Sequence, residues 1–215
     1  MPRDYSLIIG DDAPNFRAET TKGTLDFHDY IEGKWVLLTT HPTVFTGVCS
    51  TELVSEAREI AKFEERNAVA ITLAEGTTEE HLTWAAQLGS QAGVDIEFPI
   101  VSDPSFEIAK LYSLDVPKHT NFGHALSRTA IIIDPEKTVR WIVTYPPRTG
   151  RNFKEVLRVL DSLQVGDEFD VATPADWTPG DAVIVPPNQS NEAAIERFGE
   201  IDDSTAPYVR KVKVG

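Results

Sequence analysis

The sequence of 215 residues is poor in sulfur, with one cysteine, Cys49, and one methionine, Met1. A lone cysteine excludes an intramolecular disulfide, a Cys-x-x-Cys redox pair and a cysteine-rich zinc site. Two explanations of the scarcity stay open. It is compositional chance, or it suits a protein that handles oxidants, because further cysteine and methionine side chains would themselves be oxidised.

Long apolar runs and basic residues are also scarce. No apolar stretch approaches the ~20 residues that span a bilayer, and residues 1–12 lack the long apolar region of a secretory signal, so we expect a cytoplasmic protein with no membrane partner. Lys and Arg number 20 against 34 Asp and Glu, a formal net charge of −14. A surface this acidic repels phosphate backbones, so we expect no nucleic-acid partner.

Segments of strand and helix character alternate along residues 1–164. The hydrophobic share of 41% is enough for a sizeable core, and Asp134 to Lys137 has the turn chemistry of a β-hairpin. We predict an α/β domain with a mixed central sheet flanked by helices. The predicted strands are 35–40, 68–74, 98–101, 129–134 and 139–145, and the predicted helices are 50–66, 78–88, 103–112 and 152–163.

Residues 165–215 have a different character and form a C-terminal extension. The stretch 166–187 holds four prolines and two glycines, and it is followed by a short predicted helix at 191–198. About fifty residues are too few for a dependable core of their own. We therefore expect this segment to pack on the main domain or on a second subunit.

The candidate reactive residues lie in the segment from His41 to Ser50, between the first predicted strand and the helix that follows it. Cys49 falls in the first helical turn or just before it, where unpaired N–H groups stabilise a thiolate. A mostly ionised thiol at neutral pH requires a shift of roughly 2.5 pKa units, or about 3.4 kcal/mol. The helix terminus supplies ~0.3–1 kcal/mol, whereas one arginine at ~4 Å supplies about 4 kcal/mol. A reactive cysteine here thus requires an arginine from elsewhere in the chain.

Each residue of this segment also has a purely structural interpretation. Cys49 alone is compatible with a small buried hydrophobe, the usual fate of a free cysteine. Thr46 is compatible with a helix N-cap, which does not exclude a catalytic role. His41 is compatible with a polar residue at the end of a strand.

Four motifs follow one another along the chain. The first is Pro42-x-x-x-Thr46-x-x-Cys49, the second is Ser127-Arg128-Thr129 before an apolar strand, and the third is Pro-x-x-x-Gly-Arg-Asn before the closing helix. The last is Thr173-Pro174-Ala175-Asp176-Trp177 with Gly180-Asp181. In this order they resemble the peroxiredoxins, thiol peroxidases with a thioredoxin-like fold: the first resembles their active-site motif and the last the C-terminal extension of their one-cysteine subgroup. The resemblance covers nearly the whole chain.

The resemblance implies catalytic roles around the lone sulfur. Cys49 would be the peroxidatic nucleophile, and the Thr46 hydroxyl with the N–H groups of Val48 and Cys49 would hold the peroxide oxygens. Arg128 would lower the pKa of the thiol and stabilise charge on the leaving oxygen. Pro42 would shape the pocket and limit water.

Supporting residues and departures follow from the same resemblance. Glu52, one helical turn after Cys49, would orient Arg128, with His41 and Arg151 as further supports. The family usually carries an acidic or small residue where Val44 stands and a proline where Gly47 stands. Gly47 leaves the loop more flexible, so we expect a lower peroxidase rate and a changed tendency to overoxidation.

The implied function is reduction of hydrogen peroxide and organic hydroperoxides through a sulfenic acid on Cys49. Because the chain has no second cysteine, an external thiol or other small reductant must regenerate it. The implied assembly is a homodimer joined through the segment after Gln164, or a ring of higher order, and neither cofactor nor metal is implied. The alternatives are a peroxide sensor or redox relay that signals through oxidised Cys49, and a scaffold in which Cys49 is inert packing.

Overall fold

The computed structural model describes residues 6–116 and 125–214. The chain divides into two compact units, Met1–Phe153 and Lys154–Gly215. The boundary expected after residue 164 lies inside one helix, α5 (Phe153–Phe169). The units are described separately below.

The first unit is built on a mixed sheet of seven strands in the order β2-β1-β5-β4-β3-β8-β9. Strands β3, β4 and β5 are parallel, whereas β8 runs antiparallel to both β3 and β9. The predicted mixed sheet with a closing hairpin is confirmed. The bounds are β1 (Arg17–Thr20), β2 (Gly23–Asp26), β3 (Trp35–His41), β4 (Ala68–Ala74), β5 (Ile100–Ser102), β8 (Arg128–Ile133) and β9 (Val139–Tyr145), with a separate ribbon of β6 (Asp115–Val116) and β7 (Ala125–Leu126).

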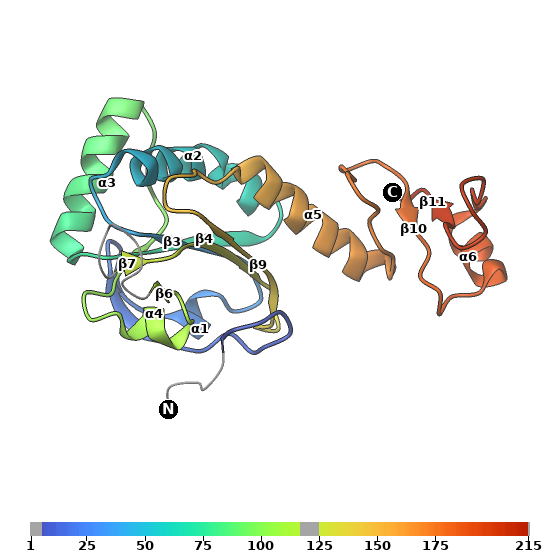
Figure 1. Cartoon of the computed structure of the whole chain (residues 1–215), viewed down its shortest axis with the longest axis horizontal. Coiled ribbons are helices and arrows are strands. Elements are labelled where there is room, and N and C mark those ends of the chain that lie inside the picture. The colour runs from blue at the N-terminus through green and yellow to red at the C-terminus, as the bar shows by residue number, and fades with distance from the viewer. Residues whose placement is uncertain (1–5, 117–124, 215) are drawn as a thin grey trace. The chain divides into compact units, whose positions relative to one another are not determined.

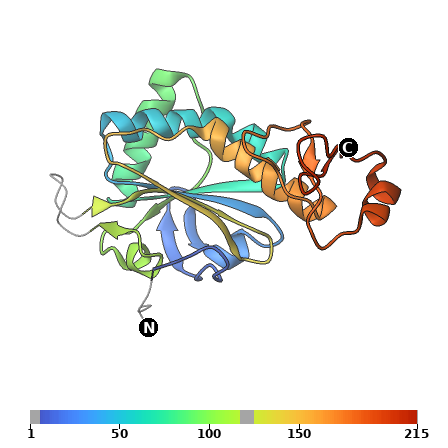
Figure 2. The ribbon, with the colours of Figure 1, turned by 45° about the vertical axis from the view of Figure 1, so that its right-hand side comes forward.

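Helices cover both faces of this sheet (Figures 1 and 2). On one face lie α2 (Gly47–Glu64) and α3 (Thr78–Ala92), and on the other lie α1 (Phe27–Tyr30) and α4 (Glu107–Leu111). The start of α3 is fixed by a capping box between Thr77 and Glu80. The flanking helices predicted from the sequence are therefore present.

Strand β3 lies in the middle of the sheet and is buried along its whole length. Successive side chains of a strand point to opposite faces. Val36 and Leu38 accordingly join the apolar core shared with α1 and α4, whereas Thr39 faces α2, where its hydroxyl bonds to Glu56. Thr39 and His41, the polar residues of β3 on this face, are thus buried beneath α2.

Several local features differ from the sequence predictions. Helices α3 and α5 continue past their predicted ends at 88 and 163, to Ala92 and Phe169, and the β6–β7 ribbon was not predicted. The hairpin of β1 and β2 was not predicted. Helix α2 begins three residues earlier than expected, at Gly47. Helix α4 begins only at Glu107, because Phe106 adopts a left-handed conformation (φ 58°) and the Asp103 carboxylate accepts the N–H groups of Glu107 and Ala109.

The second unit has a small apolar core of its own, so the expectation of a coreless segment is wrong. Its strands β10 (Val183–Ile184) and β11 (Lys211–Val212) pair antiparallel, and α6 spans Asn191–Phe198. This pairing returns the end of the chain to the centre of the unit. The buried residues are Val171, Trp177, Val183, Val185, Ala194 and Val212. Within the described ranges, no helix combines the length and the hydropathy that crossing a membrane requires.

Candidate active site

Cys49 is the third residue of α2, in its first turn, as the sequence predicts. The residue is only 1% exposed, yet it lines a pocket of about 500 Å³. The sulfur is therefore recessed but lies at the wall of a space that a small substrate can enter. The pocket is lined by Pro42, Thr43, Thr46, Gly47, Val48, Cys49, Glu75, Arg128, Pro147 and Arg148.

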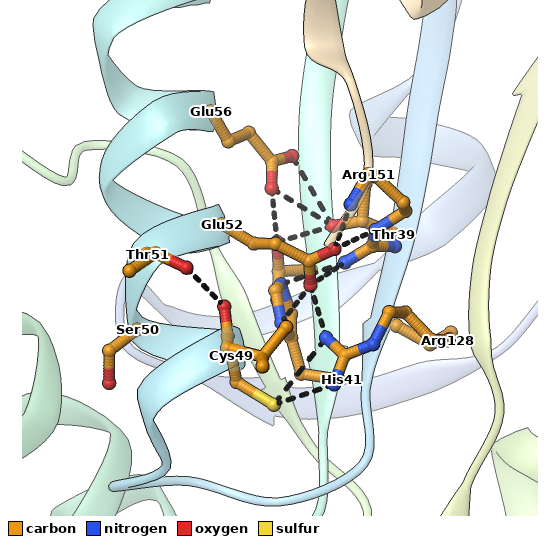
Figure 3. A network of polar contacts seen from close by, with 12 residues as sticks. Thr39, His41, Cys49, Ser50, Thr51, Glu52, Glu56, Arg128 and Arg151 are labelled. Atoms are coloured by element: carbon orange, nitrogen blue, oxygen red, sulfur yellow. Dashed lines mark hydrogen bonds and ion pairs between the residues drawn. The ribbon is translucent and has the colours of Figure 1, made fainter. Parts of the chain in front are cut away.

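Arg128, the first residue of β8, brings the guanidinium that the thiolate argument requires. Its Nη1 and Nη2 atoms each lie 3.7 Å from Cys49 Sγ (Figure 3). Nη2 also donates a hydrogen bond of 2.8 Å to the carbonyl of Pro147. A delocalised cation at this distance stabilises a thiolate, because Coulomb attraction favours the charged form of the sulfur.

Glu52, one turn after Cys49 in α2, forms ion pairs with two buried arginines. Its Oε2 forms an ion pair with Arg128 Nη1, and it accepts Nη2 of Arg151 at 2.9 Å. Its Oε1 accepts the backbone N–H and Nε of Arg151 at 2.6 and 3.0 Å. Burial opposes ionisation of this carboxyl, but the hydrogen bonds and charges of His41 and Arg151 hold the pKa of Glu52 well below its usual range.

His41 lies at the end of β3 with its imidazole fully buried. Its Nδ1 is 3.4 Å from Glu52 Oε2, its Nε2 is 3.4 Å from Arg151 Nη2, and its ring meets Trp84 edge to face. The guanidinium of Arg151 is held in turn by the carbonyl of Thr129 at 2.6 Å. The histidine is therefore fixed on three sides.

The pKa of the Cys49 thiol is lowered to about 6. Burial acts against this shift, but the hydrogen bond and charge of His41, the Thr46 hydroxyl and the backbone at Thr43 outweigh it. Arg128 acts in the same direction from 3.7 Å. His41, which the family resemblance implies as a support, thus lowers the pKa of Cys49 as well as facing Glu52 and Arg151.

Thr46 occupies the N-cap position of α2 with extended backbone angles, but its side chain caps no backbone N–H. The hydroxyl instead donates to the carbonyl of Thr43 at 3.3 Å, and it lowers the pKa of the Cys49 thiol. Of its two interpretations, the geometry favours a role at the sulfur. Pro42 and Val48 line the same pocket, as expected from the motif.

The two departures from the family pattern lie at the edges of this site. Val44 packs against the apolar cluster that contains Cys49 and Leu53. Gly47 is exposed, is the first residue of α2 and would accept a Cβ without meeting any atom within 4 Å.

One buried acid, Glu56, is not among the site residues expected from the sequence. The structure buries it completely. Residues Cys49, Glu52 and Glu56 recur at i, i+3 and i+7, the spacing of a single helix face, and that spacing was the available signal. In the described part of the chain, no group of three or more His, Cys, Asp or Glu side chains could hold a metal ion.

Comparisons with known proteins agree with this geometry. Residues 9–142 match the AhpC/TSA family, and residues 162–200 match the C-terminal domain of 1-Cys peroxiredoxin. Peroxiredoxin PRX1, a mitochondrial protein of Saccharomyces cerevisiae, is 41% identical over 212 residues, covering 96% of this chain and 81% of its own. Peroxiredoxin-6 of Gallus gallus is 41% identical over 198 residues, covering 89% and 88% of the two chains.

Solved structures are similar over nearly the full length. A yeast mitochondrial 1-Cys peroxiredoxin, solved to study its thiol resolving mechanism via glutathione and thioredoxin systems, superimposes with a TM-score of 0.90 at 41% identity, covering 97% of this chain and all of its own. Peroxiredoxin 6 of Arenicola marina gives a TM-score of 0.90 at 36% identity, covering 97% and 98%. The predicted thioredoxin-like fold is thus confirmed. With both family regions in order and one reactive cysteine beside an arginine, the chain belongs to the AhpC/TSA family and is a thiol peroxidase of the 1-Cys peroxiredoxin type.

Proposed function

We propose that Cys49 is the peroxidatic nucleophile and that it reduces hydrogen peroxide and organic hydroperoxides. The observation that carries this proposal is the sulfur at the pocket wall, 3.7 Å from both terminal nitrogens of Arg128, with its pKa lowered to about 6. At pH 7 such a thiol is mostly thiolate, the form that attacks peroxide.

The chemistry balances with the groups at the site. The thiolate attacks the terminal oxygen of the hydroperoxide, the S–O bond forms, and the O–O bond breaks. The other oxygen leaves as alkoxide or hydroxide, which takes a proton from solvent, and Cys49 becomes a sulfenic acid. Arg128 is a preorganised donor near the place where charge develops on the leaving oxygen. The Thr46 hydroxyl lines the same pocket and can turn from the Thr43 carbonyl to donate to a bound peroxide.

An external thiol completes the cycle. One thiol molecule condenses with the sulfenic acid to give a mixed disulfide and water, and a second thiol releases reduced Cys49. The proposal of a thiol of the glutathione or thioredoxin class is supported by the yeast relative, whose study concerns both systems.

Turnover tests this function against the alternative of a peroxide sensor. With excess glutathione or thioredoxin and hydrogen peroxide, an enzyme consumes many equivalents of peroxide per Cys49, whereas a sensor consumes one and stops. We expect multiple turnovers in the wild type and none in Cys49→Ser. One equivalent only, with every supplied thiol, would favour the sensor, and turnover that survives in Cys49→Ser would exclude Cys49 as the nucleophile.

The homodimer is also a proposal. It is supported by large apolar side chains that remain exposed in the second unit, with Ile195 52% and Tyr208 83% exposed. Light scattering coupled to size-exclusion chromatography distinguishes a monomer, a dimer and a ring. The cytoplasmic location stays a prediction, and one relative is mitochondrial; fractionation of the source cells tests it.

A further inference from the structure

The regular pairing of β3 with β8 ends before it reaches Arg128. The last paired residues are Thr39 and Ala130, whereas Arg128 lies two residues nearer the start of β8 and is its first residue. Strand β3 leads into α2, which carries Cys49. The distance from the sulfur to the guanidinium therefore depends on how the two strands are held together beyond their last regular pair.

The hydroxyl of Thr40 bonds to both peptide groups that flank Arg128. Its Oγ1 accepts the N–H of Thr129 at 2.9 Å and donates to the carbonyl of Ser127, while the carbonyl of Thr129 is more distant, at 3.4 Å. The Ser127 carbonyl belongs to the peptide before Arg128, and the Thr129 N–H belongs to the peptide after it. A hydroxyl has one proton to donate and lone pairs to accept with, so one side chain makes both bonds. Thr40 thus replaces the next pair of the ladder.

These bonds are shielded from bulk water. Thr40 and Thr129 are buried, and Ser127 is half-buried. A buried backbone group that loses its partner cannot exchange it freely for water, so the loss is costly. Removal of the Thr40 hydroxyl would take a partner from the peptide on each side of Arg128, and the local backbone would have to move to find others.

The backbone of Arg128 sets the direction in which its side chain leaves the strand. Two planar peptide groups meet at its Cα atom, and holding both of them fixes the bond from Cα to Cβ. From there the side chain reaches Cys49 Sγ with both Nη atoms at 3.7 Å (Figure 3). Its guanidinium end is held by Glu52 and by the carbonyl of Pro147. Thr40 holds the backbone end of the same residue.

We propose that Thr40 is a positioning residue of the peroxide reaction, whose hydroxyl aligns the backbone of Arg128 so that the guanidinium meets the sulfur of Cys49. The inference rests on the proposed roles of Cys49 and Arg128. Coulomb attraction weakens as the distance between two charges grows, and a displaced donor stabilises a leaving oxygen less well. A shift of the Arg128 backbone should therefore raise the pKa of the thiol and slow the peroxide reaction together.

Two substitutions at Thr40 separate the hydroxyl from the shape of the side chain. Thr40→Val keeps the shape and removes the hydroxyl, whereas Thr40→Ser keeps the hydroxyl. In Thr40→Val we expect the pKa of the Cys49 thiol, measured by iodoacetamide alkylation across pH, to rise from about 6 by about half to one unit. The stopped-flow rate constant with hydrogen peroxide at about pH 8.5, where the thiol is ionised in both proteins, should fall about tenfold. Thr40→Ser should restore both values.

A double-mutant cycle with Arg128→Ala distinguishes positioning from a general loosening of the fold. If Thr40 acts through the arginine, adding Thr40→Val to Arg128→Ala should change the rate constant by less than about twofold, because the group that it positions is already absent. A further loss of about tenfold in the double variant would show that the effect of Thr40 does not pass through Arg128, and it would overturn the proposal.

A matched control removes a neighbouring hydroxyl. The hydroxyl of Thr144 in β9 bonds to the side chain of Thr129 at 2.9 Å, whereas that of Thr40 bonds to its backbone. Thr144→Val should therefore leave the pKa of the thiol and the peroxide rate unchanged. An effect of Thr144→Val as large as that of Thr40→Val would show that any lost hydroxyl beside Thr129 slows the reaction, and it would count against a specific role of Thr40.

Hydrogen exchange measures the proposed bond itself. The N–H of Thr129 should exchange about tenfold or more faster in Thr40→Val than in wild type or Thr40→Ser. If Thr40→Val does not fold, Thr40→Ala leaves room for a water molecule at the two peptide groups and should show the same changes at smaller size. Wild-type values of the thiol pKa and the peroxide rate in the variant without the hydroxyl overturn the inference, even if that variant is less stable. Peroxide turnover in Cys49→Ser would instead overturn the proposed function.

Discussion

Both terminal nitrogens of Arg128 lie 3.7 Å from the sulfur of Cys49, across a separation of 79 residues in the chain. The contact exists because β8 pairs with β3, whose end leads into the helix that carries the cysteine. Arg128 is itself fixed by Glu52 and by the carbonyl of Pro147. The guanidinium is therefore oriented before any substrate arrives.

Loss of this guanidinium should weaken both the acidity and the reactivity of Cys49. In Arg128→Ala we expect the pKa of the thiol to rise from about 6 by about one to two units. The rate constant with peroxide should fall about 10²- to 10³-fold, because a preorganised donor is removed. Arg128→Lys keeps the charge but not the two-nitrogen geometry, so its rate constant with peroxide should lie between those of wild type and Arg128→Ala.

Alkylation by iodoacetamide across pH reports the thiol pKa, and stopped-flow kinetics reports the rate. Arg58→Ala removes an exposed arginine of α2 and is the matched control, with no expected change. If Arg128→Ala retains a midpoint near 6 and the wild-type rate, the arginine has no part in activating the sulfur.

Thr46 should matter for the reaction and little for stability. Because its side chain caps no N–H of α2, Thr46→Val should change the free energy of unfolding by less than about 0.5 kcal/mol, whereas a true cap is worth ~1 kcal/mol. The peroxide rate should fall about tenfold or more, and Thr46→Ser should restore it. Urea unfolding measures the contribution of Thr46 to stability, and stopped-flow kinetics measures its contribution to the peroxide reaction. A Thr46→Val protein that is less stable but reacts at the wild-type rate would show that Thr46 acts as a helix cap and not in the reaction.

The central strands and helices along the chain and the identity of the reactive sulfur could be predicted from the sequence, since both depend on local patterns. The run Trp35 to Thr40 and the hairpin at Asp134 to Lys137 appear in the structure close to their predicted places. The requirement for an arginine also followed from magnitudes alone. Family resemblance, and not physical argument, then selected Arg128 from among the arginines.

The burial of Glu56 and the effect of His41 on the pKa of Cys49 could not be predicted in the same way. Both depend on how closely α2 packs on β3. From the sequence alone, a glutamate in a helix that carries many acidic residues is expected on the surface. Its burial becomes evident only when Thr39 and Thr72 are seen to pair across β3 and β4 beneath it. Long-range packing of polar groups leaves little trace in a hydrophobic pattern.

Gly47 should be replaceable by proline with a gain in stability. It is the first residue of α2, where proline is favoured, and Thr46 before it has the extended angles that proline requires, φ −111° and ψ 152°. We expect Gly47→Pro to raise the free energy of unfolding by about 0.4–1 kcal/mol through a less flexible unfolded chain. If ordering of this loop limits the reaction, as expected from the sequence, the peroxide rate should rise about two- to fivefold.

A matched glycine shows whether such a gain is specific. Gly33 has a left-handed φ of +68°, so Gly33→Pro should destabilise the protein under the same urea titration. A Gly47→Pro protein that unfolds more easily than wild type would show that the loop needs the freedom of glycine.

Glu56 should leave a signature in the pH dependence of stability. In the unfolded chain its carboxyl ionises near the ordinary value of 4.5, whereas burial raises the pKa of Glu56 to about 7 in the folded protein. Between these values the folded state binds more protons than the unfolded state, so rising pH disfavours folding. Relative to wild type, Glu56→Gln should therefore gain stability from about pH 4.5 to about pH 7, by about 3 kcal/mol in all, and no further above that.

Urea unfolding of both proteins at several pH values gives this difference. The contributions of Glu52 and Cys49 are common to the two proteins and largely cancel in the comparison. A difference between Glu56→Gln and wild type that does not change between pH 4.5 and pH 7 would mean that Glu56 is ionised well below neutrality in the folded state, and it would overturn this prediction.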